Sequence, residues 1–210
     1  MTSPHHSPPD PLETALRAPT PLEPGAWERL RAELARRAEA DGLLDVAFER
    51  HDSPLGPILL GATDEGLVRV GLPTEDRDAV LDELARRISP RLLRASWATL
   101  RVARHQLEGY FNGTRRAFDV TLDWRLTRGF RREVLHATAQ IPYGQTSSYR
   151  QVATRAGSPA AVRAAGTALA LNPLPIIVPC HRVVRSDGQL GAYRGGAPAK
   201  AQLLEFERTQ

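Results

Sequence analysis

The sequence is poor in sulfur. Its 210 residues include one cysteine, Cys180, and one methionine, Met1. A single cysteine excludes an intramolecular disulfide, and it excludes a structural zinc site built from several thiolates. The histidines do not replace those thiolates, because no metal-ligand spacing is shared by His51, His105, His136 and His181. We therefore expect no metal.

Long apolar runs are also missing. No stretch approaches the roughly 20 residues that span a bilayer, and the N-terminus lacks the basic-then-apolar pattern of a signal peptide. The content of 41% hydrophobic and 25% charged residues is ordinary for a soluble globular protein. We expect a cytoplasmic protein that makes no membrane contact.

Acidic residues are scarce in the second half of the chain. Residues 125–210 hold twelve Arg and Lys against four Asp and Glu, so this part carries +8 and residues 1–124 carry −4 of the net +4. A basic half indicates a polyanionic partner such as nucleic acid. The alternative is a basic surface that is merely solvated.

Three regions follow from the composition. Residues 1–44 combine a proline-rich tail, predicted to be disordered or loosely attached over 1–25, with one amphipathic helix that ends at Gly42. We expect its apolar face, formed by Trp27, Leu30 and Leu34, to pack against the protein. Residues 45–124 form an N-terminal domain, and residues 125–210 form a C-terminal domain.

The N-terminal domain has a strand pattern followed by helices. The turn signals SPLGP and TDEG separate three predicted antiparallel strands at 45–51, 57–62 and 67–71. Helices are predicted at 76–88 and 96–111, with Leu100, Leu107 and Phe111 on one face of the second. A further strand is predicted at 117–122. The fold class is therefore α+β in this half.

The C-terminal domain is predicted to be mainly helical. A first helix ends before Ile141-Pro142, because the residue preceding proline is driven out of helical geometry. A second is capped by Ser147 or Ser148 and stops at Gly157. A third has Ser158 as cap and Pro159 at its first position. The last two form a candidate helix-turn-helix.

The third helix is nearly bare of side chains. Arg163 is the one long side chain among alanines and Gly166. Tight packing against a neighbouring helix explains this composition, and so does a close approach to a nucleic-acid groove. Because the helix lacks a set of base-reading side chains, DNA contact here would read shape and phosphate rather than sequence.

The lone cysteine also has two interpretations. A buried cysteine is commonly an inert core residue. A reactive one must become a thiolate, which requires a nearby base or positive charge. His181 and Arg182 follow Cys180 in the sequence, although adjacency alone does not bring side chains into contact.

The surrounding motifs decide between these interpretations. In order, the chain contains IPYGQTSSYRQVA from Ile141, RAAG from Arg163, NPLPIIVPCHRVV from Asn172, GQLGAYRGG from Gly188 and a final K…LLEFE. This array resembles the O6-alkylguanine-DNA alkyltransferases. The resemblance implies a ribonuclease-H-like N-terminal domain and a winged-helix-like C-terminal domain with a helix-turn-helix. It implies no cofactor.

The resemblance also implies a role for each matching residue. Cys180 would accept the alkyl group, His181 would act as base through a water, and Glu207 would orient His181. Asn172 would be a hinge between the recognition helix and a buried active-site strand formed by the apolar stretch before Cys180. Tyr149 would donate a hydrogen bond to the leaving guanine. The DNA contacts would come from Ser148, Tyr149, Arg163, Ala164 and Gly166. The base pocket would be formed by Val183, Tyr193, Arg194, Gly195, Gly196 and Lys200.

The implied function is DNA repair by direct reversal. The alkyl group of O6-alkylguanine, and of O4-alkylthymine, would pass irreversibly to Cys180 after minor-groove binding and base flipping. The partner would be double-stranded DNA, bound by a monomer with cooperativity left open. Arg194 departs from the small residue of some relatives and would either contact phosphate or narrow the pocket.

Two other functions remain open at this point. A lesion-binding module of the same fold would bind damaged DNA without transfer, although such relatives lack the reactive cysteine. A cysteine hydrolase would need an oriented base, yet Cys180 does not lie on a nucleophile elbow.

Overall fold

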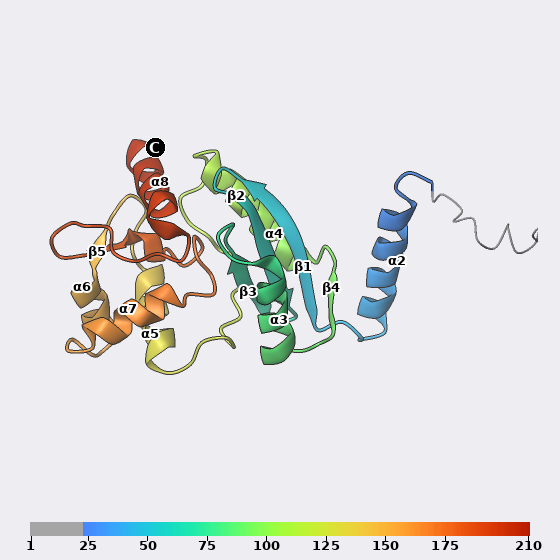
Figure 1. Ribbon diagram of the computed structural model, residues 1–210, viewed down its shortest axis with the longest axis horizontal. Helices are drawn as coiled ribbons and strands as arrows, with labels where there is room; N and C mark the ends of the chain where they lie inside the picture. The colour runs from blue at the N-terminus through green and yellow to red at the C-terminus, as the bar shows by residue number, and fades with distance from the viewer. Residues whose placement is uncertain (1–22) are drawn as a thin grey trace, which may run out of the picture.

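A computed structural model describes residues 23–210, so the tail predicted over residues 1–25 lies almost wholly outside the described part. The described chain begins with helix α2 (Ala26–Ala40), followed by strands β1 (Val46–Ser53), β2 (Gly56–Thr63) and β3 (Gly66–Gly71). Helix α3 (Arg77–Arg87), strand β4 (Leu92–Arg94) and helix α4 (Ala98–Phe111) complete the N-terminal half (Figure 1).

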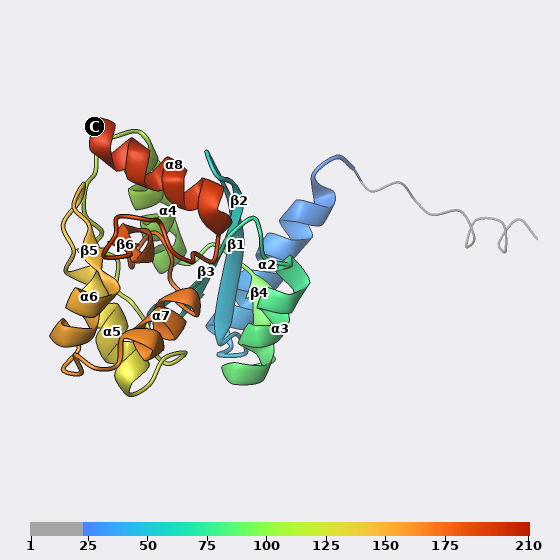
Figure 2. The same cartoon turned by 60° about the vertical axis from the view of Figure 1, so that its left-hand side comes forward.

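The three predicted strands and both predicted helices of this half are confirmed, but the sheet is mixed rather than antiparallel. Its order is β3-β2-β1-β4, and β4 runs parallel to β1. Helix α4 packs on one face, where Leu100 and Leu107 join the main core. Helix α3 covers the other face, where Leu84 meets Val46 and Val68 (Figure 2).

The strand predicted at 117–122 is wrong. The segment makes one isolated bridge, between Leu67 and Leu122. The backbone amides of Asp119 and Val120 instead donate to the side-chain oxygen of Gln106 on α4. The Gln106 side chain thus takes the place of the backbone carbonyls of a neighbouring strand, which would otherwise accept from these two amides.

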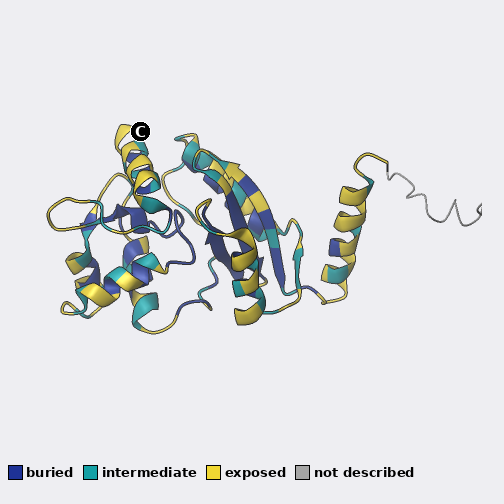
Figure 3. Ribbon diagram, viewed as in Figure 1, coloured by how far each residue is buried: buried dark blue, intermediate teal, exposed yellow. Residues whose placement is uncertain are grey.

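Helix α2 forms as predicted, but its apolar face does not pack against the protein. Trp27, Leu30 and Leu34 are 53%, 55% and 56% exposed, and Ala35 is the buried residue of this helix. Figure 3 shows the helix as almost wholly exposed. The expectation that Trp27, Leu30 and Leu34 are packed is therefore wrong.

The C-terminal half contains helices α5 (Phe130–Ala139), α6 (Tyr149–Arg155), α7 (Val162–Ala170) and α8 (Gly196–Thr209). A 3-10 turn, η1 (Cys180–Arg182), and two short parallel strands, β5 (Ser147–Ser148) and β6 (Val183–Val184), lie between them. The predicted end of α5 before Ile141 is confirmed. None of the helices in the described chain is long and apolar enough to cross a membrane.

The helix-turn-helix is present, with one shifted boundary. Ser148 caps α6 through a capping box with Gln151, which fixes the start of this helix. Helix α7 begins at Val162 rather than at Pro159. Ser158 is not its cap, because the Ser158 carbonyl accepts from the Ala161 amide in a separate turn.

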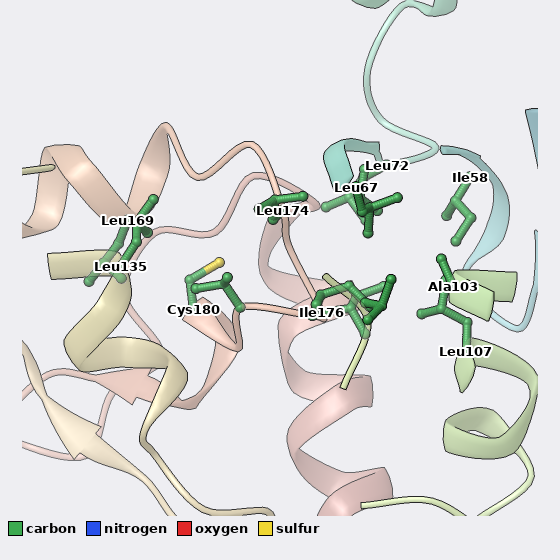
Figure 4. Close-up of a cluster of buried hydrophobic side chains, with 14 of the residues drawn as sticks. Ile58, Leu67, Leu72, Ala103, Leu107, Leu135, Leu169, Leu174, Ile176 and Cys180 are labelled. Carbon is green, nitrogen blue, oxygen red and sulfur yellow. The ribbon is translucent and has the colours of Figure 1, made fainter. Parts of the chain in front are cut away.

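The apolar stretch before Cys180 is buried but is not a strand. The prolines at 173, 175 and 179 have no amide hydrogens to donate to a ladder. Ile176 takes a left-handed φ of 73°, and the Val178 amide donates to the Leu174 carbonyl. The stretch is therefore a buried, irregular turn that leads into η1. Figure 4 shows Cys180 with Leu135 and Leu169 on one side and Ile176 on the other.

Candidate active site

Cys180 begins the 3-10 turn and is 3% exposed. Burial raises the pKa of its thiol to about 11, although the Asn172 amide and the positive charge of Lys200 lower it in part. Asn172 Nδ2 lies 3.2 Å from the Cys180 sulfur and 2.9 Å from the Val178 carbonyl oxygen. One amide group therefore touches the thiol and holds the turn before it.

His181 and Glu207 form a buried pair. His181 Nε2 lies 2.8 Å from Glu207 Oε1, and the two side chains are 0% and 1% exposed. Burial lowers the pKa of His181, and the Glu207 carboxylate offsets this in part. The other ring nitrogen, Nδ1, is buried and has no hydrogen-bond partner among residues 23–210. A carboxylate that accepts from Nε2–H leaves Nδ1 free to accept a proton.

Glu207 has further partners that the sequence analysis missed. Arg182 donates from Nε to Oε2 at 2.8 Å and from Nη2 to Oε1 at 2.9 Å, and Tyr110 donates to Oε1 at 2.7 Å. Burial alone would raise the pKa of Glu207, but the hydrogen bonds from His181 and Arg182 lower it to about 2. The carboxylate is therefore fixed in both charge and position.

One of these two extra partners could be found from the sequence. Arg182 lies inside the motif that carries Cys180, so its position directly after His181 is a usable signal. Tyr110 lies on α4 in the other half of the chain and joins Glu207 only through packing. No sequence pattern pointed to that contact.

Lys200, on α8, is fully buried beside the same centre. Its Nζ donates to the Val183 carbonyl at 2.6 Å and lies 5.9 Å from the centroid of the Tyr149 ring. Burial lowers the pKa of Lys200 to about 8, and the negative form of Cys180 acts in the opposite direction. The site thus holds a positive charge where a thiolate would form.

Four of the five predicted DNA-contacting residues line one cleft. A cleft of about 510 Å³ has walls from α6, α7 and the loop after β6, and its lining includes Ser148, Tyr149, Arg163 and Gly166. Ala164 is exposed on the same helix as Arg163. Two further cleft arginines, Arg150 and Arg185, were not predicted. Their charge gives the cleft an anion-attracting character.

Tyr149 faces the loop that closes this cleft. Its hydroxyl lies 3.4 Å from the Ala192 carbonyl, and burial together with the charge of Cys180 raises its pKa. Gly191, with a φ of 67°, packs so closely that an added Cβ would lie 2.5 Å from the Tyr149 oxygen. Only glycine fits there.

The predicted pocket residues come from β6, from the loop that follows it and from α8. Val183 is buried, and the Tyr193 ring lies edge-on to His181 with centroids 6.3 Å apart. Gly195 packs against Tyr193, where an added Cβ would lie 2.8 Å from the ring, and Gly196 begins α8. Arg194 points toward the N-terminal domain and pairs with Glu75 at 2.8 Å. Two of its donors thus have protein partners, and the expected phosphate contact or narrowed pocket stays a prediction.

No group of three His, Cys, Asp or Glu side chains within residues 23–210 is arranged to hold a metal ion. Cys180 instead shares its 3-10 turn with His181, and His181 is paired with the Glu207 carboxylate. This arrangement is typical of a thiol that is activated by a base.

Comparison with known proteins gives a consistent match over both halves. Residues 46–124 match the family model described as "6-O-methylguanine DNA methyltransferase, ribonuclease-like domain", and residues 129–209 match its "DNA binding domain". The Methanosarcina acetivorans protein named methylated-DNA--protein-cysteine methyltransferase is 38% identical over 74% of this chain and 94% of its own. The Mycobacterium tuberculosis protein of that name is 38% identical over 79% and 94%.

Solved structures agree with these matches. The crystal structure of Mycobacterium tuberculosis OGT in complex with DNA is 36% identical, with a TM-score of 0.66 over 78% of this chain and 93% of that chain. An archaeal O6-methylguanine-DNA methyltransferase, from Pyrococcus kodakaraensis, shares the fold at a TM-score of 0.56, over 77% of this chain and 98% of that chain. The chain belongs to the 6-O-methylguanine DNA methyltransferase family.

Proposed function

We propose that this protein repairs alkylated DNA by moving the alkyl group from O6-alkylguanine to Cys180. The observation that carries the proposal is the buried His181–Glu207 pair directly after Cys180, whose thiol is contacted by the Asn172 amide. The names of the relatives, including one solved in complex with DNA, support the same chemistry. We extend the proposal to O4-alkylthymine.

Proton removal is the first chemical step. Glu207 accepts from His181 Nε2–H, so Nδ1 is the free acceptor for the proton of the Cys180 thiol, relayed through one water. The raised pKa of the thiol, about 11, makes this help necessary, because almost no thiolate exists at neutral pH without it. Lys200 stabilises the thiolate electrostatically as it forms.

Displacement follows at the saturated carbon of the alkyl group. A sulfur–carbon bond forms while the carbon–oxygen bond breaks, and the electron pair goes to O6 of guanine. The raised pKa of Tyr149 keeps its hydroxyl protonated, so it can donate to that oxygen. The product is a thioether with no carbonyl for water to attack. The protein therefore acts once.

The reacting oxygen is unreachable while the base is stacked, so the base must leave the duplex at a cost of roughly a few kcal/mol. In the proposal, α7 enters the minor groove, where Ala164 and Gly166 allow close approach. Arg163 fills the space that the base vacates, and Ser148 contacts the backbone. Val183, Tyr193, Gly195 and Gly196 shape the pocket that receives the base.

The proposal assigns DNA binding and transfer to residues 125–210 and support of the site to residues 45–124. It leaves residues 1–44 as an addition outside both domains, and it treats the protein as a cytoplasmic monomer.

The test is an intact-mass measurement after incubation with O6-benzylguanine and, separately, with a duplex containing O6-methylguanine. We expect one adduct per protein, located on Cys180 by peptide mapping and absent in Cys180→Ser. Tight binding to the lesion duplex without any adduct would instead support the lesion-binding function. Acyl-enzyme burst kinetics with an ester would support the hydrolase.

A further inference from the structure

A short segment of the N-terminal domain lies against the loop that closes the active site. Thr74 Oγ1 donates to the Arg194 carbonyl at 3.1 Å. Gly195 packs so closely on Leu72 that an added Cβ would lie 3.0 Å from its Cδ1. Arg194 Nε pairs with Glu75 Oε2 at 2.8 Å. Backbone, packing and charge therefore all join this segment to the loop.

Glu75 is held firmly by its own domain. Its carboxylate pairs with Arg69, whose side chain is 1% exposed, and its Oε1 accepts from the Leu72 amide at 2.9 Å. Arg69 in turn pairs with Glu83 on α3 at 3.2 Å. Because a buried guanidinium fixes this carboxylate, Glu75 presents a rigid acceptor to Arg194, which pairs with the same oxygen, Oε2.

Arg194 carries this connection to the thiol. Its Nη1 donates to the Asn172 carbonyl at 3.1 Å, and the Asn172 side chain touches the Cys180 sulfur at 3.2 Å. The next residue, Pro173, accepts from the Val70 amide at 2.8 Å. A continuous path therefore runs from Arg69 through Glu75, Arg194 and Asn172 to Cys180.

We propose that Glu75 and Arg194 form an interdomain clamp that positions Asn172 and the 191–196 loop for alkyl transfer. Both are positioning residues, since they act through Asn172 and through the placement of Tyr193. The inference rests on the proposed function and extends it to a second link with the N-terminal domain, beside the hydrogen bond from Tyr110 to Glu207. A displacement of about 1 Å at a reacting group can cost roughly a hundredfold in rate, so a clamp this close to the thiol affects the chemical step.

The test measures adduct formation with O6-benzylguanine over a range of concentrations, which separates the maximal rate constant from the half-saturating concentration. Arg194→Ala and Glu75→Gln should each lower the maximal rate constant about tenfold and change the half-saturating concentration less than twofold. Arg194→Lys should lose less, because an ammonium can keep Glu75 but cannot also reach the Asn172 carbonyl. The double variant Glu75→Gln/Arg194→Ala should be no slower than the slower single variant.

Asp82→Asn is the matched control, because it also turns a carboxylate of the N-terminal domain into an amide, but Asp82 is exposed on α3 and pairs with Arg86. It should react at the wild-type rate. The clamp is overturned if Arg194→Ala and Glu75→Gln also react at that rate, if the losses multiply in the double variant, or if Asp82→Asn is as slow as Glu75→Gln. Absence of any adduct in the wild-type protein would overturn the proposed function itself, which separates the two failures.

Discussion

His181 Nε2 lies 2.8 Å from Glu207 Oε1, and neither side chain is reached by solvent. The contact fixes which ring nitrogen carries the proton, provided that Glu207 stays ionised. Arg182 and Tyr110 ensure that it does, since both donate to the same carboxylate. The base of the proposed reaction is therefore prepared by residues that never touch the substrate.

Replacing Glu207 with Gln should slow alkyl transfer strongly. The Gln amide can donate from its NH2 group to Nε2, which favours the tautomer with the proton on Nδ1. Nδ1 can then no longer accept the proton of the thiol. We expect at least about a hundredfold lower rate of adduct formation with O6-benzylguanine, followed by intact mass. Glu205→Gln on the same helix, exposed and paired with Arg208, is the control and should react normally. A normal rate in Glu207→Gln would contradict the relay.

The same carboxylate should make stability depend on pH. The pKa of Glu207 in the folded protein is about 2, lowered from an ordinary 4.5, so the unfolded chain binds its proton more readily. The resulting stabilisation is fully present above about pH 4.5 and is lost as the pH falls toward 2. It is on the order of 3 kcal/mol.

Urea unfolding at several pH values measures this effect. The difference in unfolding free energy between the wild type and Glu207→Gln should be constant above about pH 5 and should shrink by roughly 3 kcal/mol toward pH 2. A difference that does not change with pH would contradict the lowered pKa.

Asn172 should lower the pKa of the free Cys180 thiol. Its amide lowers the pKa of Cys180 against the larger effect of burial, so Asn172→Ala should raise that pKa further and reduce the thiolate fraction. Labelling by iodoacetamide at pH 9 should slow several-fold, whereas labelling of the urea-unfolded chain should be the same for both proteins. The free energy of unfolding of this variant should also fall by about 1–3 kcal/mol, because the Leu174 amide loses its acceptor. Unchanged labelling would show that the 3.2 Å contact has no influence on the sulfur.

How much of the fold and of the site the sequence predicts depends on how far apart in the chain the interacting residues lie. The Cys180 motif, the capping box at Ser148 and the strand turns are local, so they could be predicted from short patterns. Tyr110, Glu75 and Arg69 join the site across the domain boundary, and only the packed structure brings them there.

The wrong predictions have physical causes of the same kind. The stretch before Cys180 has strand-like composition, but three prolines and the left-handed Ile176 replace a strand by a turn. Strand β4 was missed because its three residues include Arg94 and gain their pairing only from β1. The apolar spacing of Trp27, Leu30 and Leu34 indicated a helix correctly, but spacing cannot tell whether a partner face exists.

Binding to undamaged duplex should weaken steeply with salt, since each neutralised phosphate releases counterions. Arg150 and Arg185 line the cleft beside Arg163. Removing either by substitution with Ala should reduce the slope of log K against log salt by about 0.9. Fluorescence anisotropy of a labelled duplex in a KCl series measures this slope. Arg86→Ala, exposed on α3, should leave the slope unchanged, and an unchanged slope in the cleft variants would exclude these arginines from the DNA contact.

Arg163→Ala separates base flipping from chemistry. Arg163 is exposed on α7 at the cleft and has no place in the path of hydrogen bonds to Cys180, so its loss leaves the thiol as it was. We expect repair of O6-methylguanine in a duplex to slow at least about tenfold, because the vacated space in the stack is no longer filled. The reaction with free O6-benzylguanine needs no flipping and should keep its rate within about twofold. Arg155→Ala removes an exposed arginine from the end of α6, outside the cleft lining, and should affect neither reaction. Equal losses on duplex and free base would instead place Arg163 in the chemical step, and a loss on neither would leave flipping to another residue of α7.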